Sequence, residues 1–246
     1  MIYSIIPARG GSKGVPDKNM KLLCGYPLMA YSIVASILCG KISRTIVSTD
    51  SEKIADMALR FGAEVPFLRP EEFARDNSAD IEFMLHAIRW FQDNEGGVPQ
   101  YMVHLRPTTP LREPLIVERA LNTLLENETA TSLRSGHPAS ESPFKWFLLK
   151  ETGYFTSIHP DYSNEYINKP RQSFPTVYIP DGYVDVVKTS FILESKILHG
   201  EKMVGFVSPV CREVDTIEDF DYIEFELSQK GSSLFDYMKT KYPQEV

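Results

Sequence analysis

Three basic residues lie in a glycine-rich stretch near the start of the sequence. Arg9, Lys13 and Lys18 share the segment 8–19 with three glycines. Glycine lets a backbone turn sharply and approach a ligand closely, and successive loop N–H groups can form a concave anion site. Arg and Lys add charge and hydrogen-bond donors. The segment therefore predicts a phosphate-binding loop, although it fits neither G-x-x-x-x-G-K-[ST] nor G-x-G-x-x-G, and a solvated surface turn is the alternative.

A second group of candidate ligands lies near the carboxyl end. Glu213 and Asp215 alternate along an expected extended segment, which would place both side chains on one face. Two carboxylates supply the hard oxygen ligands that Mg²⁺ takes together with substrate phosphate oxygens. The alternative is an acidic helix start, capped by Asp215 or Thr216 and favoured by Glu218 and Asp219.

The elements that must position these residues alternate along the chain. The apolar run 2–6 ends at a proline and predicts a buried strand just before the basic loop. Nucleotides bind at the carboxyl ends of strands in open α/β sheets. The alternation predicts a largely parallel sheet with covered faces. Further strands are expected at 45–49, 65–68, 101–105, from 129 to 134, at 184–187 and at 203–207, and helices at 28–38, 51–62 (with a capping box at 49–52), 80–91, 114–125 and 217–229.

Composition narrows the class of protein. The chain has 246 residues, 43% of them hydrophobic, and a net charge of −7, which fits a globular protein and argues against a general nucleic-acid binder. Its three cysteines form no C-x-x-C motif, and its five histidines show no metal-binding spacing. The start does not look like a signal peptide, and no apolar run approaches membrane-spanning length. We therefore expect a cytoplasmic protein with neither a membrane nor a nucleic-acid partner.

The segment 6–19, Ile-Pro-Ala-Arg-Gly-Gly-Ser-Lys-Gly-x-Pro-x-Lys-Asn, resembles the signature of the acylneuraminate cytidylyltransferases. These are the CMP-sialic acid synthetases and their bacterial nonulosonate relatives, in which this loop wraps the phosphates and base of CTP. The resemblance implies that Arg9, Lys13 and Lys18 hold phosphates, with Arg9 and Lys18 catalytic because they stabilise the departing pyrophosphate. Asn19 would face the cytidine. The implied nucleotide-binding residues of the loop are Ala8, Arg9, Gly10, Gly11, Ser12, Lys13, Lys18 and Asn19.

Two further segments extend the resemblance. The segment from Arg69 to Asp76 is similar to the family's loop at the nucleoside, so Arg69 would bind the cytidine side, while Asp76 could equally cap the next helix. The segment 106–112, Arg-Pro-Thr-Thr-Pro-Leu-Arg, resembles a motif that usually begins with Gln and faces the sugar. Arg106 and Asp185 stand where the family more often has an amide and an aromatic residue, so the acceptor sugar is not fixed as N-acetylneuraminate.

Glu213 and Asp215 also match the family's Asp-x-Asp-Thr-x-x-Asp motif, whose first two acids bind the metal. The resemblance implies Mg²⁺, with Mn²⁺ as an alternative, held mainly by Asp215. Lys145 and Arg171 match basic residues that the family aims at the acidic sugar or its phosphate.

The segment 141–180 differs in texture, with weak periodicity and many aromatic residues. It could belong to the core or form an arm with a partner surface, since aromatics concentrate at interface centres. The resemblance favours a dimerisation arm that also contributes to the sugar pocket.

The sequence thus predicts one cytidylyltransferase domain over 1–246, an α/β, Rossmann-like nucleotidyltransferase with a mostly parallel central sheet, a small dimerisation arm and a homodimeric state. The expected reaction joins CTP to a nine-carbon 2-keto sugar acid and releases pyrophosphate. The alternatives are a CMP-Kdo synthetase-like enzyme, another sugar-nucleotide pyrophosphorylase, and a non-catalytic nucleotide-binding module.

Overall fold

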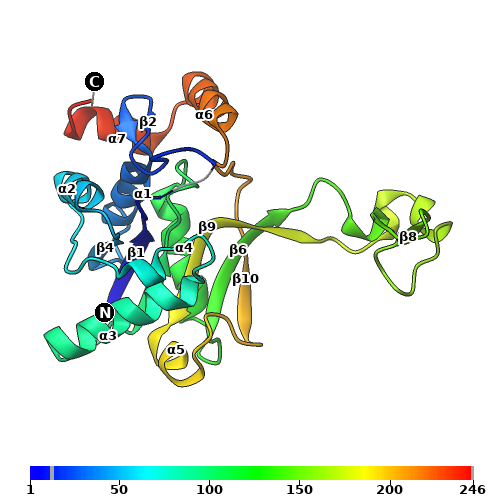
Figure 1. Cartoon of the computed structure of the whole chain (residues 1–246), viewed down its shortest axis with the longest axis horizontal. Coiled ribbons are helices and arrows are strands. Elements are labelled where there is room, and N and C mark those ends of the chain that lie inside the picture. The colour runs from blue at the N-terminus through cyan, green and yellow to red at the C-terminus, as the bar shows by residue number, and fades with distance from the viewer. Residues whose placement is uncertain (12–13, 245–246) are drawn as a thin grey trace.

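The centre of the structure, a computed structural model that describes residues 1–11 and 14–244, is a six-stranded sheet (Figure 1). Across the sheet the strands are β10 (Met203–Val207), β6 (Ser132–Pro138), β9 (Tyr178–Lys188), β5 (Tyr101–His104), β1 (Ile2–Pro7) and β4 (Arg44–Ser48). Strand β1 pairs in parallel with β4 and β5, and β10 pairs in parallel with β6. Strand β9 runs antiparallel between β5 and β6. The predicted α/β class with a mostly parallel sheet is confirmed.

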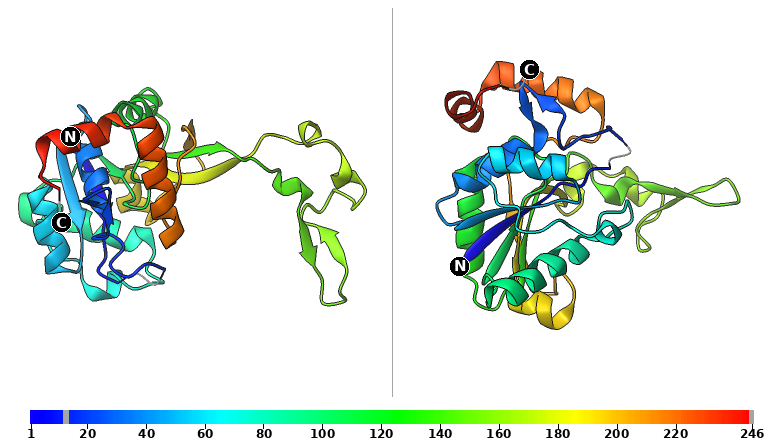
Figure 2. Two further views of the ribbon diagram at one scale, coloured as in Figure 1. Left: turned by 90° about the horizontal axis from the view of Figure 1, so that it is seen from above. Right: turned by 60° about the vertical axis from the view of Figure 1, so that its left-hand side comes forward.

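Helices cover both faces of the sheet (Figure 2). One face packs against α1 (Leu28–Ile37), α2 (Glu52–Arg60), α4 (Pro114–Leu125), α6 (Ile217–Lys230) and α7 (Ser233–Lys241). The other packs against α3 (Asp80–Glu95) and α5 (Thr189–Ser195). Along β1, Ile6 faces the first group and Ile5 the second, so both sides of the strand are buried. This is why the segment is continuously apolar rather than alternating.

Residues 139–177 leave the sheet between β6 and β9 and form an arm that projects from one side of the molecule (Figures 1 and 2). The rings of Phe144, His159, Tyr162, Tyr166 and Phe174 pack on one another and form a small core within it. The short elements of the arm are β7 (Phe147–Leu149), β8 (Phe155–Ser157), and the 3-10 helices η2 (Pro143–Lys145), η3 (Tyr166–Asn168) and η4 (Arg171–Ser173).

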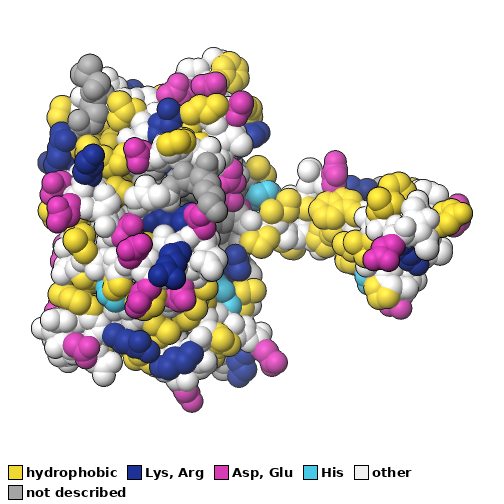
Figure 3. Space-filling model, in the orientation of Figure 1, with side chains coloured by type: hydrophobic (Ala, Val, Ile, Leu, Met, Phe, Trp, Pro, Cys, Tyr) yellow, Lys and Arg dark blue, Asp and Glu magenta, His cyan; other side chains and the backbone are white. Residues whose placement is uncertain are grey.

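Much of the arm surface is apolar (Figure 3). The hairpin made by β7 and β8, with its flanking residues, leaves six large side chains exposed: Trp146, Phe147, Leu148, Leu149, Tyr154 and Phe155. Contiguous exposed apolar surface of this kind marks an interaction site more often than a free surface.

Several local predictions are wrong. Residues 65–68 form no strand but only isolated bridges at Glu64 and Leu68. The capping box at 49–52 is absent, because Ser51 is the N-cap of α2 and Asp50 accepts a hydrogen bond from Gly10 instead. Helices α5 and α7 were not predicted; α7 begins after Ser232, whose hydroxyl accepts from the Phe235 N–H. Three short elements were also missed: β2 (Leu22–Leu23), β3 (Tyr26–Pro27) and η1 (Glu71–Phe73). In the described part of the chain, no helix is long and apolar enough to span a bilayer.

Candidate active site

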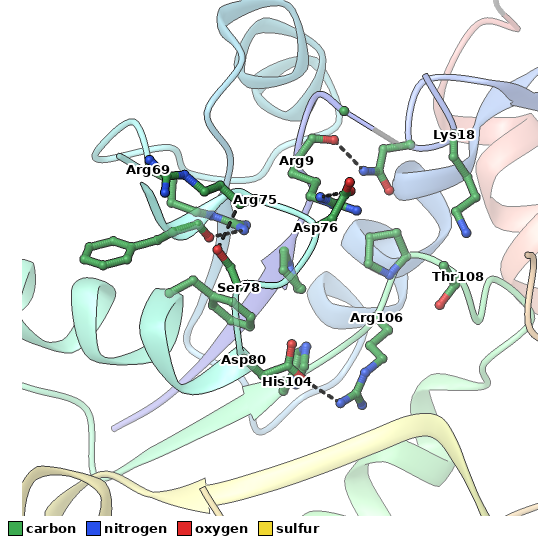
Figure 4. A pocket seen from close by; sticks show the side chains of 16 residues that line it. Arg9, Lys18, Arg69, Arg75, Asp76, Ser78, Asp80, His104, Arg106 and Thr108 are labelled. Atoms are coloured by element: carbon green, nitrogen blue, oxygen red, sulfur yellow. Dashed lines mark hydrogen bonds and ion pairs between the residues drawn. The ribbon is translucent and has the colours of Figure 1, made fainter. Parts of the chain in front are cut away.

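A cavity of about 270 Å³ opens at the carboxyl ends of β1 and β5 (Figure 4). Three segments surround it: the loop after β1, the loop that leads into α3, and the turn after β5. Among the described lining residues, five side chains are cationic and two are carboxylates, although the chain as a whole is acidic. The charged lining residues are Arg9, Lys18, Arg69, Arg75, Arg106, Asp76 and Asp80.

The loop after β1 is anchored at both of its ends. The Gly10 N–H donates to Asp50 Oδ1 at 2.8 Å, and Asn19 Nδ2 donates to the Arg9 carbonyl at 3.0 Å. Gly11 and Asn19 line the cavity, whereas Ala8 is fully buried behind it. The predicted nucleotide-binding residues Ser12 and Lys13 lie outside the described residues.

Gly14 shows how tightly the loop is packed. A Cβ at this position would lie 2.8 Å from the Asp215 carbonyl oxygen, too close for any side chain. The basic loop and the acidic segment from the far end of the chain are therefore in direct backbone contact.

Arg9 and Lys18 each bind a carboxylate. Arg9 lies 2.7 Å from Asp76 Oδ1, so the acid that could have capped α3 pairs with the loop, and Ala79 is the N-cap instead. Lys18 Nζ donates to the Val214 carbonyl at 2.8 Å and lies 3.3 Å from Asp215 Oδ1. Both cations line the cavity (Figure 4), where an incoming anion would compete with these carboxylates.

Arg69 is buried and bound by neutral groups. Its Nε donates to Ser48 Oγ at 3.0 Å, a second nitrogen donates to the Ser48 carbonyl, and the guanidinium lies over the ring of Phe83. Burial lowers the pKa of Arg69 to about 10, which still leaves it charged near neutral pH. Arg69 thus joins the end of β4 to the loop that forms one wall of the cavity.

Arg106 lies between two carboxylates. It donates to Asp185 Oδ2 and to Asp80 Oδ2, each at 2.8 Å. Burial opposes its charge, but Asp185 and Asp80 outweigh that effect and raise the pKa of Arg106. His104 lies behind this cluster, with Nδ1 4.0 Å from both acids. Burial, and then the neighbouring Arg106, lower the pKa of His104 well below its usual value, so the ring is neutral.

Glu213 and Asp215 are the candidate metal ligands. The strand expected for them is not formed, because 208–215 is irregular. Glu213 accepts from Thr108 Oγ1 at 3.2 Å, and burial is the main cause that raises its pKa. Asp215 is largely exposed and does not cap α6, whose N-cap is Thr216. Within the described ranges, no cluster of three or more His, Cys, Asp or Glu side chains could hold a metal ion by itself.

The backbone of Gly182 separates Arg106 from Glu213. Gly182 has a φ of +62°, and a Cβ on it would lie 3.1 Å from both Arg106 Cδ and Glu213 Oε1. Arg106, at the floor of the cavity, and Glu213, in the acidic segment, therefore both lie close to this one residue of β9.

Comparison with known proteins identifies the family. A family model described as cytidylyltransferase matches residues 3–183. The chain belongs to the cytidylyltransferase family. A pseudaminic acid cytidylyltransferase of Campylobacter jejuni serotype O:23/36 is 34% identical over 237 residues, which cover 94% of this chain and 98% of the relative. A CMP-N,N'-diacetyllegionaminic acid synthase of Legionella pneumophila is 39% identical over 142 residues.

Coverage differs among these relatives. The match to the Legionella synthase spans 58% of this chain and only 60% of that protein. An N-acylneuraminate cytidylyltransferase of Escherichia coli is 28% identical, and the match spans 92% of this chain but 51% of the relative. Among solved structures, a CMP:2-keto-3-deoxy-manno-octonic acid synthetase complexed with CTP superposes with a TM-score of 0.68 at 16% identity, covering 93% of this chain and 99% of that one. At that identity the likeness shows the fold.

Lys145 and Arg171 belong to the arm, and neither is among the described residues that line the cavity of this cytidylyltransferase chain. Lys145 Nζ donates to the Lys169 carbonyl at 2.8 Å, and Arg171 donates to the Ala139 carbonyl at 2.7 Å. The structure therefore brings together the loop after β1, Arg69 and Arg106, and leaves these two cations apart.

Asp80 and His104 lie in the cavity wall, but the sequence did not single them out. Nor did the sequence assign Asp50 a definite role. Asp80 is the first residue of a helix, where an acid usually serves the helix itself. His104 ends an apolar strand and looks like a core residue. Their proximity to Arg106 depends on the sheet, which no local pattern reveals.

Proposed function

We propose that this cytidylyltransferase transfers CMP from CTP to the anomeric hydroxyl of a nonulosonic 2-keto sugar acid and releases pyrophosphate. The observation that carries the proposal is the cavity at the ends of β1 and β5, where cations exceed carboxylates in an acidic protein. Such a cavity suits a triphosphate. Relatives named for legionaminic, pseudaminic and acylneuraminic acids supply the acceptor class.

In the reaction the anomeric oxygen attacks the α-phosphorus, the bond from that phosphorus to the oxygen bridging the α- and β-phosphates breaks, pyrophosphate leaves, and the hydroxyl proton passes to water. Phosphoryl-type transfer asks a protein mainly for positioning and for stabilisation of charge. Arg9 and Lys18 would take up the charge that develops on pyrophosphate, because both line the cavity from the loop that begins at the end of β1. The phosphates would replace Asp76 and Asp215 as the partners of these cations.

Glu213 and Asp215 would hold Mg²⁺, or Mn²⁺ in its place. Their hard oxygen donors fit Mg²⁺, which usually takes one or two carboxylates and completes its shell with water and substrate phosphate. Thr216 and Asp219 support the fit, because they begin α6 and so leave the Asp215 carboxylate available. When bound, the ion would supply positive charge beside the phosphates.

The arm would pair two copies of the chain. Its exposed hairpin side chains are apolar, and neither Lys145 nor Arg171 is among the described residues that line their own chain's cavity. A second copy would bring these two cations to a cavity, where they would attract the acidic sugar. Arg106 and Asp185 would then influence which sugar is accepted, since a substrate that disturbs a buried ion pair is penalised.

The direct test is a pyrophosphate-release assay with CTP and a panel of acceptors that includes legionaminic, pseudaminic and N-acetylneuraminic acids and Kdo. Release with CTP and a nine-carbon acid supports the proposal, with Arg9→Ala as the control expected to lose turnover while remaining folded. Release with Kdo alone would favour the CMP-Kdo synthetase alternative. Binding of CTP without release for any acceptor would favour a nucleotide-binding module.

A further inference from the structure

The cavity is electrically asymmetric along its length. At the end near the loop after β1, Arg9 and Lys18 are paired with carboxylates on partly exposed side chains. At the floor after β5, two acids meet one guanidinium, Asp80 and Asp185 on Arg106. The first end offers cations that an anion could bind, whereas the floor presents the Asp80 carboxylate, because Arg134, 3.8 Å from Asp185, balances the second acid there.

The two acids at the floor differ in accessibility. The Asp185 side chain is 3% exposed and pairs with Arg106 and, at 3.8 Å, with Arg134. The Asp80 side chain is 40% exposed and lines the cavity (Figure 4). Asp185 therefore balances the charge of Arg106 from behind, and Asp80 presents the carboxylate that an incoming molecule meets.

Asp80 is also held in a fixed orientation. It is the first residue of α3, where the helix dipole favours a negative charge. One of its oxygens, Oδ2, accepts from Arg106, which is itself fixed by Asp185. An ionised carboxylate accepts up to about four hydrogen bonds and donates none, so the remaining acceptor positions suit an O–H donor and repel an anion.

We propose that Asp80 is a ligand-binding residue that accepts a hydrogen bond from a hydroxyl of a sugar ring, and that it thereby orients the substrate in the cavity. The inference rests on the proposed function for the identity of the sugar, which is either the ribose of CTP or the acceptor sugar. The triphosphate would lie at the basic end and the hydroxyl-bearing ring at the Asp80 floor.

A purely structural role for Asp80 predicts something different. Its ion pair with Arg106 is partly exposed, and pairs of that kind contribute little to stability. Arg106 keeps Asp185 as a partner if Asp80 is removed. A structural role would thus give small effects that do not depend on any hydroxyl of the ligand.

The experiment pairs a change in the protein with a change in the ligand. Equilibrium binding of CTP, 2′-deoxy-CTP and 3′-deoxy-CTP is measured by calorimetry for the full-length wild type, Asp80→Ala and Asp80→Asn. If the ribose is the donor, wild type binds one deoxynucleotide about 10- to 100-fold more weakly than CTP, the usual range for a hydrogen bond to a charged group. Asp80→Ala abolishes that difference because it weakens CTP alone, and Asp80→Asn reduces it. Melting curves confirm that both variants are folded.

If the acceptor sugar is the donor, Asp80→Ala leaves all three nucleotide affinities unchanged and raises the KM for the acceptor by a similar factor in the pyrophosphate assay. Acceptor analogues that each lack one hydroxyl are the matched comparison, because only a direct hydrogen bond links the KM effect of Asp80→Ala to one particular hydroxyl. An equal rise in KM for every analogue would show that Asp80 acts only through Arg106 and would overturn the proposal.

The proposal is also overturned if Asp80→Ala weakens the binding of CTP and of both deoxynucleotides equally. It is overturned as well if Asp80→Ala leaves nucleotide affinity unchanged and, in addition, either the acceptor KM is unchanged or no acceptor turns over. Nucleotide binding needs no turnover. Coupling between Asp80 and a ribose hydroxyl without pyrophosphate release would therefore refute the proposed reaction while leaving the role of Asp80 intact.

Discussion

Replacing Asp215 with Asn separates a metal ligand from a structural acid. The Asp215 side chain is 73% exposed, and its carboxylate lies 3.3 Å from Lys18 Nζ. Exposed ion pairs of this kind contribute about 0–1 kcal/mol. For a chain of this size, 1 kcal/mol changes Tm by about 2–4 °C. Asp215→Asn should therefore lower Tm by no more than about 4 °C, since Thr216 rather than Asp215 caps α6.

The effect on activity should be much larger. Asn keeps the shape of Asp but removes the negative charge that Mg²⁺ requires. A metal ion at a phosphoryl-transfer site stabilises the transition state by several kcal/mol. Loss of even about 3 kcal/mol lowers the rate by roughly 100-fold. Pyrophosphate release, measured against Mg²⁺ concentration, should fall by at least about this factor at low Mg²⁺ and recover partly at high Mg²⁺ or with Mn²⁺.

Asp219→Asn is the matched control on the same segment. Asp219 Oδ2 accepts from the N–H groups of Asp215 and Thr216 and from the Thr216 hydroxyl. Burial opposes the charge of Asp219, but these hydrogen bonds and Arg212 together lower its pKa. The control should cost more stability than Asp215→Asn and leave the shape of the Mg²⁺ dependence unchanged. The reasoning is refuted if Asp215→Asn remains fully active at low Mg²⁺.

Three further predictions concern the glycine in β9, the buried histidine and the arm. Gly182→Ala should lower activity more than Gly96→Ala, because both glycines have positive φ but only a Cβ at 182 would meet Arg106 and the acidic segment. The check is to measure kcat and Tm for both variants and to compare the losses of kcat at an equal loss of Tm. His104 has a pKa below its usual 6.5, so its contribution to stability is complete above that pH and falls as pH drops below it. His104→Gln should therefore reduce the slope of the free energy of unfolding against pH, obtained from urea denaturation, by up to about 1.4 kcal/mol per pH unit, and an unchanged slope would contradict the assignment. Leu149→Asp (68% exposed, on the arm) should convert a dimer to monomer in sedimentation, whereas Leu115→Asp (75% exposed, on α4) should not.

Local signals were sufficient to predict the six strands of the central sheet, the basic loop and most helices. The loop after β1 could be recognised because its glycines and cations are adjacent in the sequence. The cluster of Asp80, Arg106 and Asp185 could not, because its members come from a helix, a turn and a strand that are far apart in the chain. Their contact depends on β9 lying beside β5, and strand order is not encoded in any short segment.

The acidic segment shows a different limit. Its residues were expected on a strand because alternating acids suggest one, but 208–215 is irregular. The carbonyls of Val214 and Asp215 contact Lys18 and Gly14 of the loop after β1, which takes the place of a neighbouring strand. The acidic segment is thus held by the loop after β1, 196 residues earlier in the chain, and by the turn after β5, where the Thr108 carbonyl accepts from the Val214 N–H.

The position of β9 has a consequence for folding. Strands β5 and β6 are synthesised before β9, yet they pair with it rather than with each other. Until 178–188 is available, both keep an unpaired edge, and the central sheet cannot close. The intervening arm has its own aromatic core, so its early collapse would shorten the loop that separates β6 from β9. Because non-local pairing slows folding, a substitution that loosens the arm should delay closure of the whole sheet and prolong the exposure of its edges to aggregation.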